Sequence, residues 1–122
     1  MVARVVNGVL IAESVRPGQK LDGLVMTTFE RWENPAPAAG QPSVWTILRF
    51  ESTCDADELA EMFSDVLDAP GWYVDFESDG QKFVVYPGKI FTYAAGDASG
   101  RAEAIAYGKL AEVPDDQLDW GE

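Results

Sequence analysis

A regularly spaced set of apolar side chains inside the most acidic part of the chain constrains the fold more than any other sequence feature. Four large apolar residues recur at positions i, i+3, i+4 and i+7, which places them on one face of a helix: Leu59, Met62, Phe63 and Val66. Asp55, with Glu58 three residues later, is typical of a helix start, and Pro70-Gly71 is typical of a helix end. The pattern predicts a helix over about residues 55–68.

Acidic residues are segregated along the chain. Of the 122 residues, 21 are acidic and 9 are basic, which gives a formal net charge of −12. Ten acidic residues and no basic one lie between Phe50 and Gln81, and five more acidic residues follow Lys109. Residues 1–49, by contrast, hold five basic and four acidic residues. Basic protein surfaces are therefore the partners that this charge favours.

The acidic residues of the predicted helix fall on the side opposite to its apolar face. Burial of the apolar face against a sheet turns these carboxylates toward solvent, where they form a continuous row. Because the chain has no His, few groups titrate between pH 5 and 8, and the row keeps its charge over that range. We interpret the row as the candidate partner-binding surface. Its residues are Glu58, Glu61, Asp65 and Asp68.

The rest of the chain reads mainly as strands, because β-branched and aromatic segments alternate with turn residues. Asn7-Gly8 is typical of a tight hairpin turn within residues 5–11, and a single strand over residues 9–15 is the alternative. Three prolines between Asn34 and Pro42 predict a loop. The remaining strands are expected at residues 24–32, 44–50, 72–77, 82–86 and 90–93.

A second helix is predicted from Asp97 or Ala98 to Leu110, with Asp97 as its cap. The small side chains of its expected inner face should let it lie close against a sheet. That face is Ala98, Ala102, Ile105 and Ala106. Leu118 and Trp120 are expected to hold the C-terminal segment in place.

These elements, in the order three strands, helix, three strands, helix, predict a single α+β domain over residues 1–122. We expect an antiparallel sheet of about five to six strands with two helices packed on one face. The length fits one domain, and no internal repeat or linker stands out.

Several chemistries lack the residues that they need. The absence of His excludes Ser-His-Asp and Cys-His catalysis, and no phosphate-binding loop or nucleophile motif occurs. The single Cys54 cannot form an internal disulfide and leaves too few ligands for zinc. We therefore expect no catalytic residue, no cofactor and no metal.

The charge and the apolar pattern also bear on partners and location. Nine scattered basic residues among 21 acidic ones provide no phosphate-binding surface, so neither nucleic acid nor an anionic membrane is expected as a partner. No run approaches the roughly 18 apolar residues of a membrane span, and the first residues lack a secretory pattern. The lone thiol fits a reducing compartment, so a cytoplasmic location is expected.

Two carboxylates, Asp75 and Glu77, share one side of a predicted strand, with Tyr73 beside them. Paired carboxylates can perform general acid–base chemistry, although an exposed polar strand face gives the same pattern. Residues 75–80 also resemble the first half of an EF-hand loop. Tyr86 stands where that loop needs Glu and strands flank the segment, so a surface hairpin is the better interpretation.

Four short segments in the second half of the chain together support a family resemblance. They are WYVDF at residues 72–76, PGKIFTY at 87–93, GDASGRAEA at 96–104 and QLDW at 117–120. With these segments, residues 72–120 resemble a group of small uncharacterised proteins from high-GC soil bacteria. The resemblance implies a bacterial origin and a shared fold, and it transfers no catalytic residue.

Three functional hypotheses follow. The first is a non-catalytic interaction protein that offers its acidic surface to a basic partner, in the manner of immunity proteins and small inhibitors. The second is a small-ligand-binding or carboxylate-based enzyme domain that uses an aromatic pocket with Asp75 or Glu77; a deep pocket lined by them would favour it. The third is a structural subunit or homodimer, for which an exposed apolar sheet face would be the sign.

Overall fold

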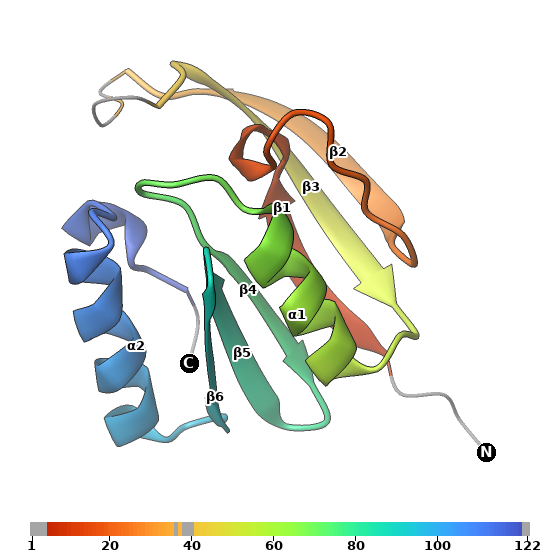
Figure 1. Cartoon of the computed structure of the whole chain (residues 1–122), viewed down its shortest axis with the longest axis vertical. Coiled ribbons are helices and arrows are strands. Elements are labelled where there is room, and N and C mark those ends of the chain that lie inside the picture. Colours follow the sequence, from red (N-terminus) through yellow and green to blue (C-terminus); the bar gives the residue numbers. More distant parts are fainter. Residues whose placement is uncertain (1–4, 36, 38–40, 121–122) are drawn as a thin grey trace.

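The computed structural model describes residues 5–35, 37 and 41–120, and within them it has six strands and two α-helices. The strands are β1 (Val6–Ile11), β2 (Val25–Glu33), β3 (Val44–Ser52), β4 (Val74–Ser78), β5 (Gln81–Tyr86) and β6 (Lys89–Ala94). The helices are α1 (Ala56–Val66) and α2 (Ala98–Leu110). The predicted α+β class, with an antiparallel sheet and two helices, is confirmed (Figure 1). Neither helix in this part of the chain is long and apolar enough to cross a membrane.

All six strands belong to one antiparallel sheet in the order β2-β3-β1-β4-β5-β6. β1 lies between β3 and β4, so that Asn7 stands opposite Glu51 on one side and Glu77 on the other. The first strand of the chain therefore joins the β2-β3 pair to the β4-β5-β6 meander. β2 and β6 form the two edges of the sheet (Figure 1).

Asn7-Gly8 lies inside β1, and the hairpin predicted there is wrong. Gly8 stands opposite Phe50 on β3 and Phe76 on β4. A Cβ atom at Gly8 would lie 2.5 Å from Cζ of Phe50 and 2.7 Å from Cβ of Phe76. Glycine is needed here because two buried aromatic side chains meet over the strand, which is a packing requirement and not a turn signal. The alternative prediction, one strand in place of a hairpin, is correct. The strand spans Val6–Ile11 and not the predicted residues 9–15.

Helix α1 forms as its periodicity predicts and buries its apolar face over the middle of the sheet. Its side chains join a cluster that includes Leu10, Phe50 and Phe76 from three different strands. The buried residues of the helix are Leu59, Ala60, Phe63 and Val66. The carboxylate of Asp55 caps the first turn by accepting from two backbone N–H groups. The helix ends at Val66, two residues earlier than predicted.

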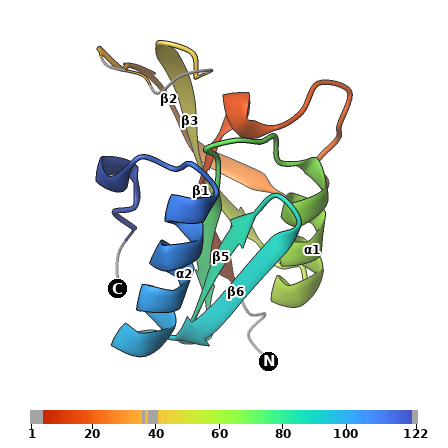
Figure 2. The same cartoon turned by 60° about the vertical axis from the view of Figure 1, so that its left-hand side comes forward.

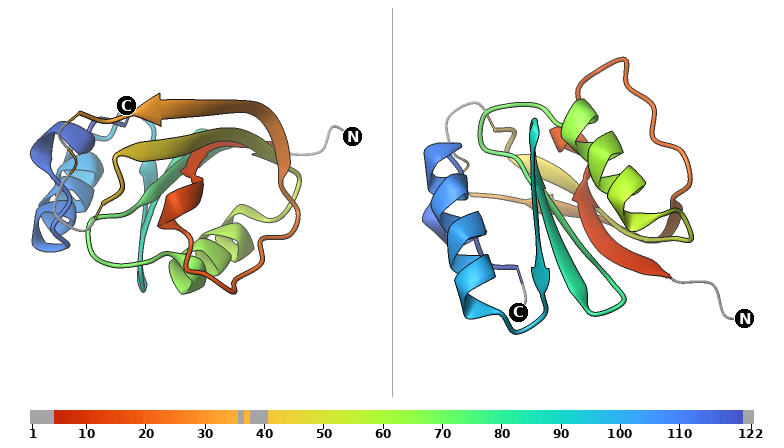
Figure 3. Two further views of the ribbon diagram at one scale, coloured as in Figure 1. Left: turned by 90° about the horizontal axis from the view of Figure 1, so that it is seen from above. Right: turned by 60° about the horizontal axis from the view of Figure 1, so that its bottom comes forward.

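The two helices lie on opposite faces of the sheet, so the prediction that both pack on one face is wrong (Figures 2 and 3). Strand β5 decides this arrangement, because its alternate residues point to opposite faces. Phe83 and Val85 pack in the cluster beneath α1, whereas Val84 and Tyr86 pack in the cluster beneath α2. The four consecutive apolar residues of β5 thus mark a strand buried on both faces.

The inner face of α2 also differs from the prediction. Gly100, Ala104 and Gly108 face the sheet at four-residue spacing, whereas Ala98, Ala102 and Ala106 are exposed and Ile105 is only half-buried. The Tyr86 hydroxyl donates a 2.7 Å hydrogen bond to the Ala104 carbonyl. A Cβ atom at Gly108 would lie 2.6 Å from that hydroxyl oxygen, and one at Gly100 would lie 2.4 Å from Cβ of Tyr93. The helix axis therefore approaches β5 and β6 as closely as glycine permits.

The C-terminal segment completes the cluster beneath α2, as predicted. Leu118 and Trp120 are buried, and the Trp120 indole N–H donates a 2.7 Å hydrogen bond to the Tyr93 hydroxyl. The guanidinium of Arg101 lies over the Trp120 ring and donates to its backbone carbonyl. These contacts join the end of the chain to both α2 and β6.

The close approach of α2 gives a stability prediction. Gly100→Ala and Gly108→Ala should each lower the free energy of unfolding by about 1–3 kcal/mol, because the added methyl overpacks the contact with the sheet. Helix propensity alone would favour alanine by about 1 kcal/mol. Ala106→Gly, at an exposed position of the same helix, is the control for propensity. Chemical denaturation measures all three, and a gain in stability for either alanine variant would contradict the packing argument.

Candidate functional site

The predicted partner-binding row lies on the solvent side of α1, but only part of it is helical. Glu58, Glu61 and Asp65 are exposed on the helix. Asp68 lies beyond the helix end and is half-buried. Its carboxylate accepts a 2.9 Å hydrogen bond from the backbone N–H of Ala69. Asp68 therefore lies off the helix that carries the other three carboxylates.

The carboxylates of the α1 row stand without ion pairs in the described part of the chain. The two ion pairs found there join Lys20 to Asp22 at 3.5 Å and Lys82 to Glu77 at 3.3 Å. Arg16 lies at the C-terminal end of α1, where its guanidinium donates a hydrogen bond to the backbone carbonyl of Asp65. The exposed face of α1 is thus an array of carboxylates bounded at its C-terminal end by one arginine.

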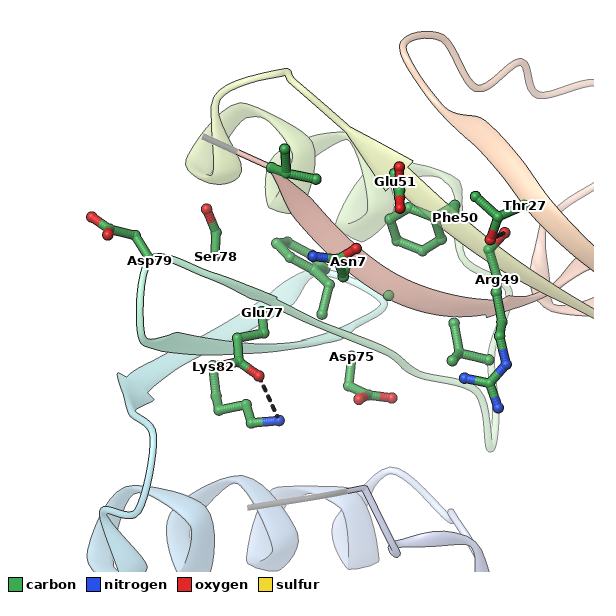
Figure 4. Close-up of a pocket in the computed structure, with 14 residues that line it drawn as sticks. Asn7, Thr27, Arg49, Phe50, Glu51, Asp75, Glu77, Ser78, Asp79 and Lys82 are labelled. Atoms are coloured by element: carbon green, nitrogen blue, oxygen red, sulfur yellow. Dashed lines mark hydrogen bonds and ion pairs between the residues drawn. The ribbon is translucent and has the colours of Figure 1, made fainter. Parts of the chain in front are cut away.

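A second polar region lies on the face of the sheet opposite α1, where α2 leaves β1, β3 and β4 uncovered. The side chains of Asp75, Glu77 and Lys82 project to the same side there, and Arg49 stands at the far end (Figure 4). They line an open depression of about 430 Å³. Strand alternation explains the grouping, because Asp75 and Glu77 are two residues apart on β4 and Lys82 stands opposite Glu77 on β5.

Asp75 is the carboxyl group of this depression that its surroundings perturb most clearly. Burial raises the pKa of Asp75 to about 6, the Lys82 ammonium acts in the opposite direction, and the Asp119 carboxylate adds to the rise. Burial likewise raises the pKa of the Tyr73 hydroxyl far above its ordinary value. That hydroxyl donates a hydrogen bond to the Gln117 carbonyl. Asp75 is therefore a partly desolvated acid, while the proton of Tyr73 is engaged in holding the C-terminal segment.

The EF-hand-like segment is a β-hairpin. Residues 75–78 belong to β4, and Asp79-Gly80 form the turn to β5 with positive φ angles of 53° and 76°. Along β4 the side chains alternate between the two faces, so Asp75 and Glu77 project away from the buried Phe76 and Ser78. No group of three or more metal-ligating side chains occurs among the described residues.

Strand β2 is a third surface, which the sequence interpretation did not single out. All nine of its residues are exposed. Phe29 has 68% of its surface exposed and Val25 has 64%, and Met26 and Trp32 are also exposed. Within the described chain β2 pairs only with β3. The sequence contains one indication that β2 is exposed on both faces. Residues 25–33 do not alternate strictly between apolar and polar side chains, as the residues of a half-buried strand do.

Comparison of the chain with protein-family models, with curated proteins and with solved structures gives no match. The resemblance of residues 72–120 to small proteins of high-GC bacteria therefore stays a prediction.

The perturbed carboxyl group predicts a pH dependence of stability. A pKa near 6 in the folded state, against 3.8 for an ordinary Asp, means that ionised Asp75 destabilises the fold above about pH 6. Asp75→Asn should therefore raise the free energy of unfolding at pH 7.5, by at most roughly 3 kcal/mol. This gain should shrink as the pH falls from about 6 to about 4.

Denaturation at a series of pH values measures this effect. Glu51→Gln is the matched control, because it removes an exposed carboxylate from the same depression and keeps both Asp75 and the ion pair of Lys82 with Glu77. The control should keep the pH dependence of the unsubstituted protein. A stability difference for Asp75→Asn that does not change with pH would contradict the desolvation of Asp75.

Proposed function

We propose that the protein is a non-catalytic interaction protein and that the exposed face of α1 binds a basic surface of a partner protein. We further propose that the protein is bacterial and lies in the cytoplasm. The observation that carries this proposal is the array of carboxylates at Glu58, Glu61 and Asp65, which has no ion-pair partner among the described residues. Immunity proteins and small inhibitors are the class of protein that this surface fits.

The arrangement of the array supports the proposal. Positions 58, 61 and 65 follow the spacing i, i+3 and i+7, so the three carboxylates lie along one side of the helix. At 1.5 Å per residue they extend over about 10 Å. The buried side chains of Leu59 and Phe63 fix the rotation of the helix on the sheet. The array is thus presented by a rigid element and needs little reorganisation to bind.

Electrostatics explains what such a surface would do. Like charges on neighbouring turns repel one another, and a basic partner relieves that repulsion as it binds. Opposite charges accelerate the association of two proteins more than they deepen its affinity. The net charge of −12 extends this attraction beyond the contact itself. A fast, salt-dependent association is therefore the expected behaviour.

Charge reversal tests the proposal. The triple variant E58K/E61K/D65K should lose the basic partner and the salt dependence of its binding. The variant E103K/D115K/D116K is the control, since it makes the same change in net charge at exposed positions of α2 and the C-terminal segment. Affinity capture from bacterial lysate, followed by association kinetics at several salt concentrations, compares the three proteins. Retention of the same proteins by all three would rule out α1 as the binding surface.

A small-ligand site in the depression beside Asp75 is the second candidate function. The desolvated carboxyl group favours it, because a group with a pKa of about 6 can exchange protons near neutral pH. Screening a library of small polar fragments by NMR tests this candidate. Binding should shift resonances of β1, β3 and β4, and it should be lost in Asp75→Asn but not in the E58K/E61K/D65K variant. The absence of shifts on these strands would argue against a ligand site.

A further inference from the structure

The two edges of the sheet differ in how the fold protects them. β6 has six residues, begins with Lys89, and packs against α2 through the buried Tyr93 and against the α1 cluster through Ile90. β2 has nine exposed residues, and neither helix lies over it (Figure 3, left). An unpaired edge presents a row of backbone N–H and C=O groups to any other strand. Strand β6 is therefore flanked by a helix on each face, whereas the edge formed by β2 is open on both faces.

The open edge also carries apolar side chains on both faces. Met26 stands opposite Phe50 and Phe29 opposite Leu48, so both lie on the face that α1 covers. Trp32 lies on the other face, where the centroid of its ring lies 5.3 Å from the centroid of the Trp45 ring. Edge strands of monomeric proteins are commonly protected by proline, lysine or a β-bulge. Residues 25–33 contain neither proline nor lysine, and the one irregularity in their pairing with β3 lies between Met26 and Thr28. The exposed apolar side chains and unpaired backbone groups of β2 are therefore the features expected of a strand that pairs with another chain.

We propose that β2 pairs antiparallel with β2 of a second copy of this chain, which forms a two-fold symmetric dimer with one continuous sheet. Charge selects this occupant. The acidic excess lies in residues 50–81 and beyond Lys109, whereas residues 1–49 are nearly neutral. Two copies with a net charge of −12 can therefore meet at β2 with less repulsion than at α1 or at the C-terminal segment. With Glu30, Arg31 and Glu33, β2 itself has a net charge of only −1, so it offers little complementary charge to a strongly charged foreign strand.

Symmetry sets the register of the pair. In a two-fold antiparallel pair one residue stands opposite its own copy, and like charges in that position destabilise the pair. Glu30 and Arg31 are excluded as centres for this reason. Phe29 is the midpoint of Val25–Glu33, so a centre there places two aromatic rings together and keeps the irregularity between Met26 and Thr28 away from the centre of the pair. Thr28 then faces Glu30 of the second copy, which brings no like charges together.

Two consequences follow from this geometry. Because the two-fold pairing uses the β2 edge of both copies, strand addition at β2 stops at two copies. Because the two-fold axis is perpendicular to the sheet, both α1 helices lie on the same face of the joined sheet. The dimer itself does not depend on the proposed role of α1, and the two can fail separately.

The mass of the protein in solution, measured by light scattering over a dilution series, tests the dimer. The unsubstituted protein should have the mass of two chains at high concentration, and Phe29→Arg should have the mass of one, because it places two like charges at the centre of the pair. Leu110→Arg is the matched control, since Leu110 is also a large apolar residue and is 81% exposed on α2. It should remain dimeric. Circular dichroism should show the same folded spectrum for all three.

A cross-link tests the register. In a Cys54→Ser background, Phe29→Cys should form an inter-chain disulfide under mild oxidation, and Leu110→Cys should not. A single-chain mass for the unsubstituted protein at every concentration would overturn the proposal. A dimer that persists in Phe29→Arg would also overturn it, because another surface would then hold the two copies together.

Discussion

The burial of β5 on both faces is the constraint on which the rest of the structure depends. Phe83 and Val85 require a cover on one side of the sheet, and Val84 and Tyr86 require one on the other. The fold meets both needs with one helix per face. Since α1 supplies its apolar side to the first cluster, its carboxylates have to face solvent. Since α2 has small residues at its contact, it can lie directly on Tyr86 and Tyr93.

The same arrangement leaves the sheet unevenly covered. The α2 layer reaches β5 and β6 and extends, through Tyr73 and Trp120, toward the start of β4. It stops short of β1 and β3, so Asp75 sits at its margin, where it is partly buried and still borders an open depression. β2 lies farther out, beyond both helices. Two helices do not cover all of a six-stranded sheet. This incomplete cover accounts both for the raised pKa of Asp75 and for the open edge at β2.

The parts of the structure that local patterns determine could be predicted from the sequence. The apolar face of α1, the caps at Asp55 and Asp97 and the hairpin turn at Asp79-Gly80 depend on residues a few positions apart. The errors involve contacts between distant segments. Gly8 is a glycine because of Phe50 and Phe76, and no local rule contains that information. The exposure of β2 depends on its place in the strand order, which the pattern of one strand does not specify.

The segregation of charge along the chain gives α1 and β2 different local charges. Screening limits the repulsion between exposed charges to about 8 Å at physiological ionic strength, so within a contact the local charge outweighs the total of −12. The edge strand carries Glu30, Arg31 and Glu33 and is close to neutral, while the carboxylates of α1 stand on a different element. The proposed self-association at β2 and the proposed attraction of a basic protein by α1 therefore place no conflicting demand on charge, because they use different elements of the fold.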